Sequence, residues 1–78
     1  MNNILIVSIY DSGWNFNACV ICDNKRVDLE EDYLNSLRHI YDLSKFYDLS
    51  KLIEKAKELN FSGIIICEDG NIVTEFFD

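Results

Sequence analysis

The sequence is poor in the segments that bind nucleotides or cross membranes. It contains three glycines, and no stretch reaches the ~18 consecutive apolar residues of a transmembrane helix. Three scattered glycines supply no glycine-rich loop that could cradle a phosphate group. Residues 1–12 lack the basic segment and the small-residue cleavage site of a secretory signal. We therefore expect a cytoplasmic protein with no membrane partner.

Candidate catalytic residues are equally scarce. His39 is the only histidine, with Ser36 three residues before it and Asp42 three residues after it. Nucleophilic catalysis needs a nucleophile, a base and an orienting group that converge on one point. This spacing instead places all three side chains along one helix surface. We expect His39 to lie in solvent near a helix end, and we expect no enzymatic activity.

The three cysteines cannot all pair within one chain. Cys19 and Cys22 lie three residues apart in a predicted strand, so they point to opposite faces, which is wrong for a redox pair. A zinc site built from Cys19, Cys22, Cys67 and His39 would need ligands from two strands and a helix, and paired knuckles are missing. We expect free, mostly buried thiols, and neither a metal nor a cofactor.

Acidic residues dominate the charge. Fourteen acids face seven bases, for a net charge of −7. Such a surface repels the phosphates of nucleic acids and membranes, so we expect no direct nucleic-acid binding. It favours a protein partner with a basic surface, although solubility or a helix start would also explain the acids. One cluster stands out: Asp28, Glu30, Glu31 and Asp32.

The first third of the chain predicts a hairpin. Strands are expected at Asn3–Tyr10 and Asn15–Cys22, joined by a turn over residues 11–13. Residues 26–29 form either a short third strand or the entry into a helix. The first strand is apolar on both faces, so it is covered on both sides or one sheet face is closed by another chain.

Two helices follow. Residues 49–59 place apolar side chains on one stripe with a 3.6-residue period. A weaker helix covers residues 30–41, and its acidic first turn suits the helix dipole. Between them, residues 41–46 are echoed by residues 47–52, so residues 42–47 form either a linker or the middle of one kinked helix. We prefer two helices, with Asp48 as the N-cap of the second.

The chain closes with a second hairpin. Asn60 and Gly63 are helix stop signals, residues 64–67 form a strand, Asp69-Gly70 is a type I′ turn, and residues 71–77 return. The prediction is one α+β domain over residues 1–78. It has two layers, with helix packed on one face of a four- or five-stranded, mainly antiparallel sheet in ββ-αα-ββ order. The strands at residues 4–9 and 64–67 should be its inner strands.

Function is predicted from size, charge and the lack of an active site. In these respects the chain is similar to the small acidic inhibitors of phages and mobile elements, including anti-CRISPR and anti-restriction proteins. We expect a non-enzymatic inhibitor that blocks a basic nucleic-acid-handling protein. The alternatives are an immunity protein or antitoxin against a basic toxin, and a structural homo-oligomer, such as a homodimer, whose second sheet face is its own interface. The expected partner-binding residues are Asp28, Glu30, Glu31, Asp32, Trp14, Tyr41 and Tyr47.

Overall fold

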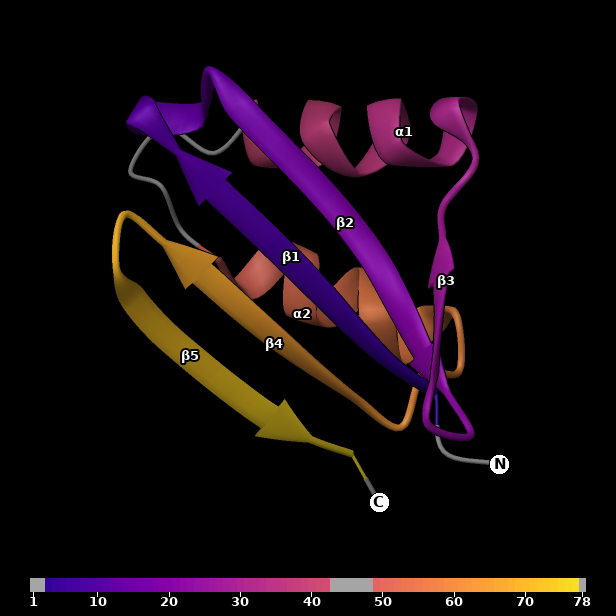
Figure 1. Cartoon of the computed structure of the whole chain (residues 1–78). Coiled ribbons are helices and arrows are strands. Elements are labelled where there is room, and N and C mark those ends of the chain that lie inside the picture. The colour runs from indigo at the N-terminus through magenta and orange to yellow at the C-terminus, as the bar shows by residue number, and fades with distance from the viewer. Residues whose placement is uncertain (1–2, 43–48, 78) are drawn as a thin grey trace.

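The computed structural model describes residues 3–42 and 49–77 (Figure 1). It confirms an α+β fold with five strands and two helices, but residues 25–28 form a third strand before the helices, so the order is βββ-αα-ββ rather than the predicted ββ-αα-ββ. In chain order the elements are β1 (Asn3–Tyr10), the short 3-10 helix η1 (Asp11–Gly13), β2 (Asn15–Cys22), β3 (Lys25–Asp28), α1 (Glu31–Asp42), α2 (Ser50–Glu58), β4 (Gly63–Glu68) and β5 (Asn71–Phe76).

The five strands form one mixed sheet in the order β3-β2-β1-β4-β5. Three neighbouring pairs are antiparallel, and β1 pairs with β4 in parallel. The prediction of a mainly antiparallel sheet with β1 and β4 inside is confirmed, but the parallel pairing of these two strands was not predicted. Just before β4, Ser62 donates its N–H to the carbonyl oxygen of Asn3 at 2.7 Å. This contact starts β4 beside the start of β1.

Two-residue turns close both outer hairpins. Asp23 and Asn24 have φ of 51° and 65°, and Asp69 and Gly70 have φ of 46° and 89°. Positive φ at both central residues is the signature of a type I′ turn, whose twist matches the twist of the flanking strands. Asn60, with φ of 64°, follows the end of α2 in the left-handed conformation. The predicted Asp69-Gly70 turn and the predicted helix stop at Asn60 are therefore confirmed.

The prediction that Gly63 is a helix stop signal is wrong. Gly63 does not end a helix but lies in β4, opposite Phe76 of β5. A Cβ atom at Gly63 would lie 2.9 Å from the carbonyl oxygen of Glu75 and 2.8 Å from the Phe76 ring. Glycine is therefore required here for close packing between two strands rather than for a left-handed backbone.

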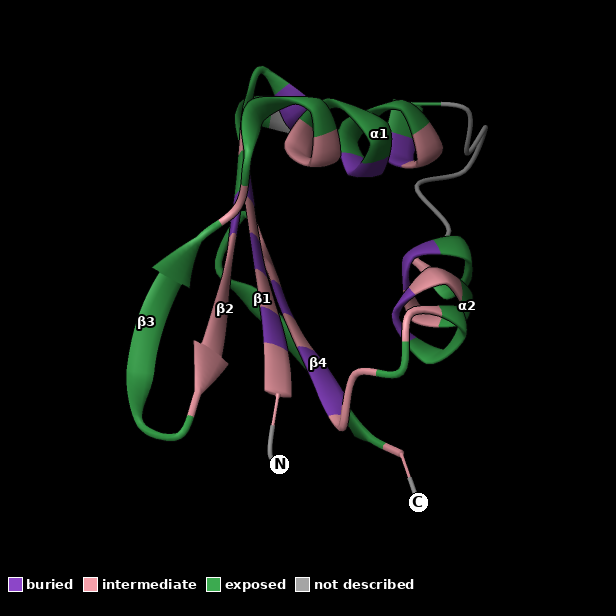
Figure 2. Cartoon of the chain, turned by 90° about the vertical axis from the view of Figure 1, so that its right-hand side faces the viewer, coloured by how far each residue is buried: buried purple, intermediate pink, exposed green. Residues whose placement is uncertain are grey.

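Both helices lie on the same side of the sheet (Figure 2). The apolar stripe of α2 turns inward as predicted, with Leu52 and Ala56 fully buried. α1 contributes Leu37 and Tyr41 to the same core. The sheet contributes Leu5, Val7, Ile9, Ala18, Ile64 and Ile66. One face of the sheet and two helix faces therefore make the whole core.

The helix boundaries shift by about one residue from the sequence expectation, which is the usual uncertainty at helix ends. α1 ends at Asp42 and α2 begins at Ser50, so the preferred two-helix arrangement holds for the described residues. The predicted N-cap Asp48 and most of the predicted linker lie outside the described residues.

Truncating the centre of the α2 stripe tests this core. Leu52→Ala should lower the free energy of unfolding by about 2–4 kcal/mol, because it leaves a cavity between α2 and the sheet. Lys51→Ala, at the exposed neighbouring position, should change it by less than about 0.5 kcal/mol. Urea unfolding followed by circular dichroism measures both, and equal effects would contradict the assigned inner face.

Candidate protein-binding surfaces

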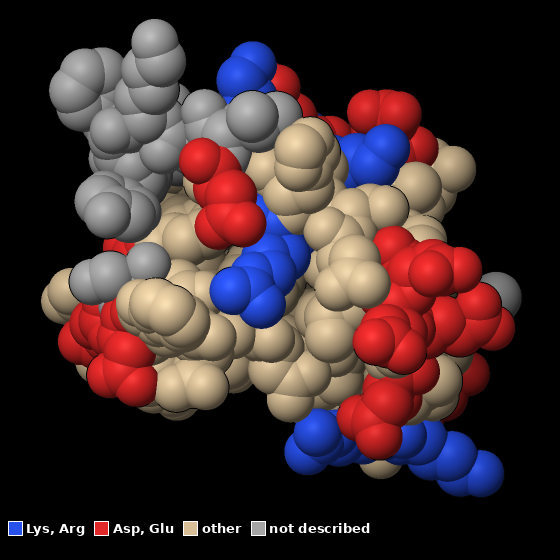
Figure 3. Space-filling model, turned by 90° about the horizontal axis from the view of Figure 1, so that it is seen from above, with Lys and Arg blue, Asp and Glu red and all other residues tan. Residues whose placement is uncertain are grey.

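The predicted acidic cluster is brought together at the junction of β3 and α1. Asp28 ends β3, Glu30 precedes the helix, and Glu31 and Asp32 lie in its first turn. The carbonyl oxygen of Glu30 accepts the Leu34 N–H at 2.9 Å and so closes that turn. All four acidic side chains are exposed. Acidic groups gather at this end of the molecule, on the right of Figure 3.

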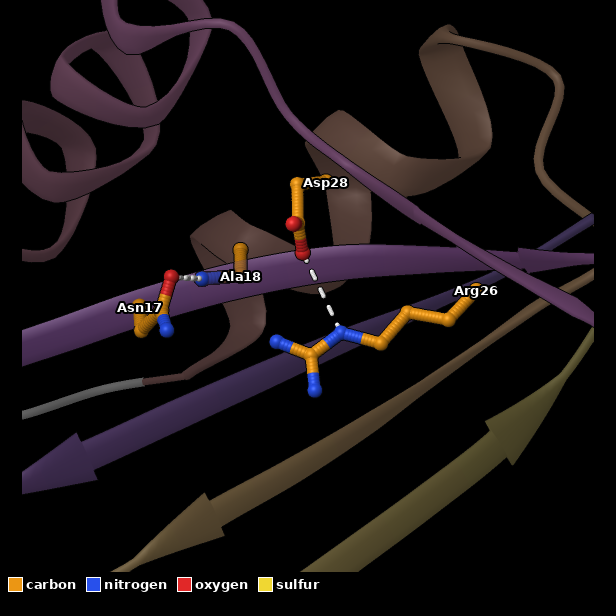
Figure 4. Close-up of polar contacts among 4 residues, drawn as sticks. All are labelled: Asn17, Ala18, Arg26 and Asp28. Carbon is orange, nitrogen blue, oxygen red and sulfur yellow. Dashed lines mark hydrogen bonds and ion pairs between the residues drawn. The ribbon is translucent and has the colours of Figure 1, made fainter.

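Asp28 differs from the other three acids. Its Oδ1 lies 3.1 Å from Nε of Arg26 in an ion pair along β3 (Figure 4). Asp28 pairs with Cys19 of β2 and shares the sheet face opposite the helices. Glu30, Glu31 and Asp32 make no ion pair with any residue that the structure describes. We therefore define the acidic end as Glu30, Glu31 and Asp32.

Trp14 lies at the other end of α1. It follows η1, where its N–H donates to the Asp11 carbonyl oxygen at 3.1 Å, and 83% of its surface is exposed. Trp14 borders a shallow hollow with Arg38 and Asp42 of α1. The 12 residues of α1 span about 18 Å at 1.5 Å per residue. The exposed indole and the acidic end thus flank one helix.

Tyr41 is buried, with 3% of its surface exposed. Its hydroxyl donates to Oε2 of Glu68 at 2.9 Å, and its ring centroid lies 5.9 Å from that of Phe16. Gly13 gives the ring room, because a Cβ there would lie 2.9 Å from Cε1 of Tyr41. Tyr41, which was expected to bind a partner, therefore holds α1 on the sheet instead and is not available to a partner. Tyr47 lies outside the described residues.

The chemistry-bearing side chains do not converge. Ser36 donates its hydroxyl to the Asp32 carbonyl oxygen at 3.0 Å, so it is not directed toward His39. Among the described residues there is no group of three or more potential metal ligands. Cys19, Cys22 and Cys67 are free as expected, but each is half-buried, whereas most of them were expected to be buried.

The side of the sheet away from the helices is a further candidate surface, which we call the open face. Strand register assigns to it Ile4, Ile6, Ser8, Tyr10, Asn15, Asn17, Cys19, Ile21, Arg26, Asp28, Ile65, Cys67, Ile72, Thr74 and Phe76. None of these residues is fully buried, in contrast to Leu5, Val7 and Ile9 on the other face of β1.

Tyr10 and Cys67 make a polar contact on the open face. The Tyr10 hydroxyl lies 3.8 Å from Sγ of Cys67. This hydrogen bond, together with the charge that the thiol can acquire, raises the pKa of Tyr10 above its usual value. Tyr10 is therefore uncharged at neutral pH, and it adds no charge to the open face.

Comparisons with protein-family models, with curated proteins and with solved structures find no match for this chain. Among the described residues, neither helix has the length and apolar character needed to cross a membrane. The function of these surfaces is therefore inferred from the residues that form them.

The Tyr41–Glu68 hydrogen bond can be tested directly. Tyr41→Phe keeps the ring contact with Phe16 and removes only the donor, so the free energy of unfolding should fall by about 1–2 kcal/mol. A double-mutant cycle with Glu68→Ala, which removes the acceptor, isolates the pair. Urea unfolding of the four proteins gives the coupling energy, and a value near zero would show that the contact does not stabilise α1.

Proposed function

We propose that this protein is a non-enzymatic inhibitor that binds the basic surface of a nucleic-acid-handling protein and blocks it. The observation that carries the proposal is the acidic end. Three exposed carboxylates are grouped at the start of α1 without an ion pair among the described residues. They occupy one end of a chain whose net charge is −7.

Electrostatics explains how such an end would act. Grouped charges of one sign attract a basic surface over about a Debye length, near 8 Å at physiological salt. They accelerate encounter and suppress binding of acidic partners, while adding less to final affinity. A carboxylate cluster competes with phosphates for the same lysines and arginines. Occupying a nucleic-acid groove in this way blocks it without any chemical step.

Trp14 supplies the apolar part of the contact. Exposed tryptophans are frequent hot spots, because burial of a large rigid ring against a partner stabilises the complex. The indole lies about one helix length from the acidic end. A partner that spans α1 would therefore meet carboxylates at one end and the ring at the other.

Charge reversal at the acidic end tests the proposal. The triple variant Glu30→Lys, Glu31→Lys, Asp32→Lys should lose capture of basic proteins from the heparin-binding fraction of a lysate, which is rich in nucleic-acid-handling proteins. Association rates with a captured protein should fall about 10- to 100-fold at low salt. Pull-down read by mass spectrometry, followed by interferometry, makes both measurements.

A matched control separates position from net charge. Glu54→Lys, Glu58→Lys, Glu75→Lys changes the total charge equally at exposed positions on α2 and β5. This control should retain capture. Equal loss of capture in both triple variants would show that net charge, and not the position of the acidic end, causes the effect. Failure of the wild-type chain to capture any basic protein at low salt would overturn the proposal.

The indole has its own test. Trp14→Ala should weaken binding to the same captured protein by about tenfold or more, mainly through faster dissociation. Because Trp14 is exposed, thermal unfolding of the free chain should be almost unchanged. Val27→Ala, at another exposed apolar residue, serves as the control. An unchanged dissociation rate for Trp14→Ala would remove the indole from the contact.

A further inference from the structure

The open face leaves apolar side chains uncovered at the centre of the sheet. Ile6 of β1 and Ile65 of β4 are neighbours on the two inner strands, and both stay half-exposed. At the β5 edge, Ile72 and Phe76 are each 69% exposed. Figure 2 shows both helices on the opposite side of the sheet. In the part of the chain that the structure describes, no helix or strand covers this face.

Charge is almost absent from the same face. Its only charged side chains among the described residues are Arg26 and Asp28, and these form an ion pair with each other at 3.1 Å. The chain as a whole carries −7. Apart from Asp28, which Arg26 neutralises, the acids that the structure describes therefore lie off the open face. A neutral face is what two equally acidic molecules need in order to approach each other.

The size of the face suits association of two copies. Five strands about 4.8 Å apart, with lengths of 8, 8, 4, 6 and 6 residues at roughly 3.4 Å per residue, cover about 520 Å². Two such faces bury roughly 1,000 Å² before side-chain corrugation is added. That area is near the roughly 1,000 Å² that a biological interface should clear, and above typical crystal contacts of under about 800 Å². The apolar centre, with polar Arg26 and Asp28 at the β3 edge, also matches the anatomy of interfaces.

We infer that the open face is the interface of a homodimer in which the sheets of two copies pack face to face. The contact is isologous, because the same face is supplied by both copies. Aligned sheet packing with interdigitating side chains then covers Ile6 and Ile65 from above. The acidic end lies on the helix layer, outside this interface. The inference therefore does not depend on the proposed inhibitory function, and each can fail alone.

A lysine placed on each face of β5 tests the interface. Ile72→Lys puts a charge on the open face at an exposed position, and it lowers the net negative charge. Weaker association therefore cannot come from added repulsion. Each dimer contains this position twice, so the dissociation constant should rise about a hundredfold. Val73→Lys, the adjacent residue on the helix side and 38% exposed, is the matched control and should remain dimeric.

Sedimentation velocity over about 1–200 μM chain measures the association. The wild-type protein should be dimeric at the upper end, and circular dichroism should show that both variants remain folded. A wild-type monomer across the range would overturn the inference. Equal dissociation of the two variants would indicate edge-to-edge pairing through β5, which would also overturn it.

The native cysteines give a second measurement that needs no variant. Cys19 and Cys67 lie on the open face, and Cys22 lies on the other face of β2. Alkylation by iodoacetamide, mapped by mass spectrometry, should slow several-fold at Cys19 and Cys67 as protein concentration rises. The rate at Cys22 should stay constant. Concentration-independent rates at all three thiols would contradict the face-to-face dimer.

Discussion

The pairing of β1 with β4 at the centre of the sheet is the constraint on which the rest of the structure depends. Both strands are apolar on both faces, because isoleucine, leucine and valine fill five of the eight positions of β1 and three of the six positions of β4. Two short helices can cover one face of such a pair. The buried side chains of α1 and α2 meet Leu5, Val7, Ile64 and Ile66 there. The described helices of so small a chain cannot cover the other face of the same strands as well.

This constraint separates two kinds of surface. The helix layer carries the acidic end, the exposed indole of Trp14 and several exposed ion pairs, such as Lys51 with Glu54. The open face is apolar at its centre and neutral in charge. Most of the charge and the uncovered apolar centre of the sheet therefore belong to different sides of the molecule. The proposed contact with a basic protein uses the helix layer, and the inferred dimer uses the open face.

The aromatic residues show where sequence reasoning reached its limit. Trp14 and Tyr41 were both candidates for surface anchors, since both lie near predicted element ends. Trp14 is exposed, but Tyr41 lies one helical turn after Leu37 and turns with it into the core. The i, i+4 spacing pointed to that burial. Gly13 and Glu68, which receive the ring and the hydroxyl, are distant in sequence and gave no local signal.

The sequence by itself determined the local elements. Strands and helices follow from apolar periods of two and 3.6 residues, and their ends follow from the Asp-Gly and Asp-Asn turns and from Asn60. These signals act over a few residues, so they can be recognised without knowing the fold. Only the tertiary structure decided the parallel direction of β1 and β4, the close packing of Phe76 on Gly63, and the choice of the sheet face that stays open. Those features depend on contacts such as Ser62 with Asn3, which lie far apart along the chain. Local propensity cannot specify such a pairing, because it is set by how the completed layers fit together.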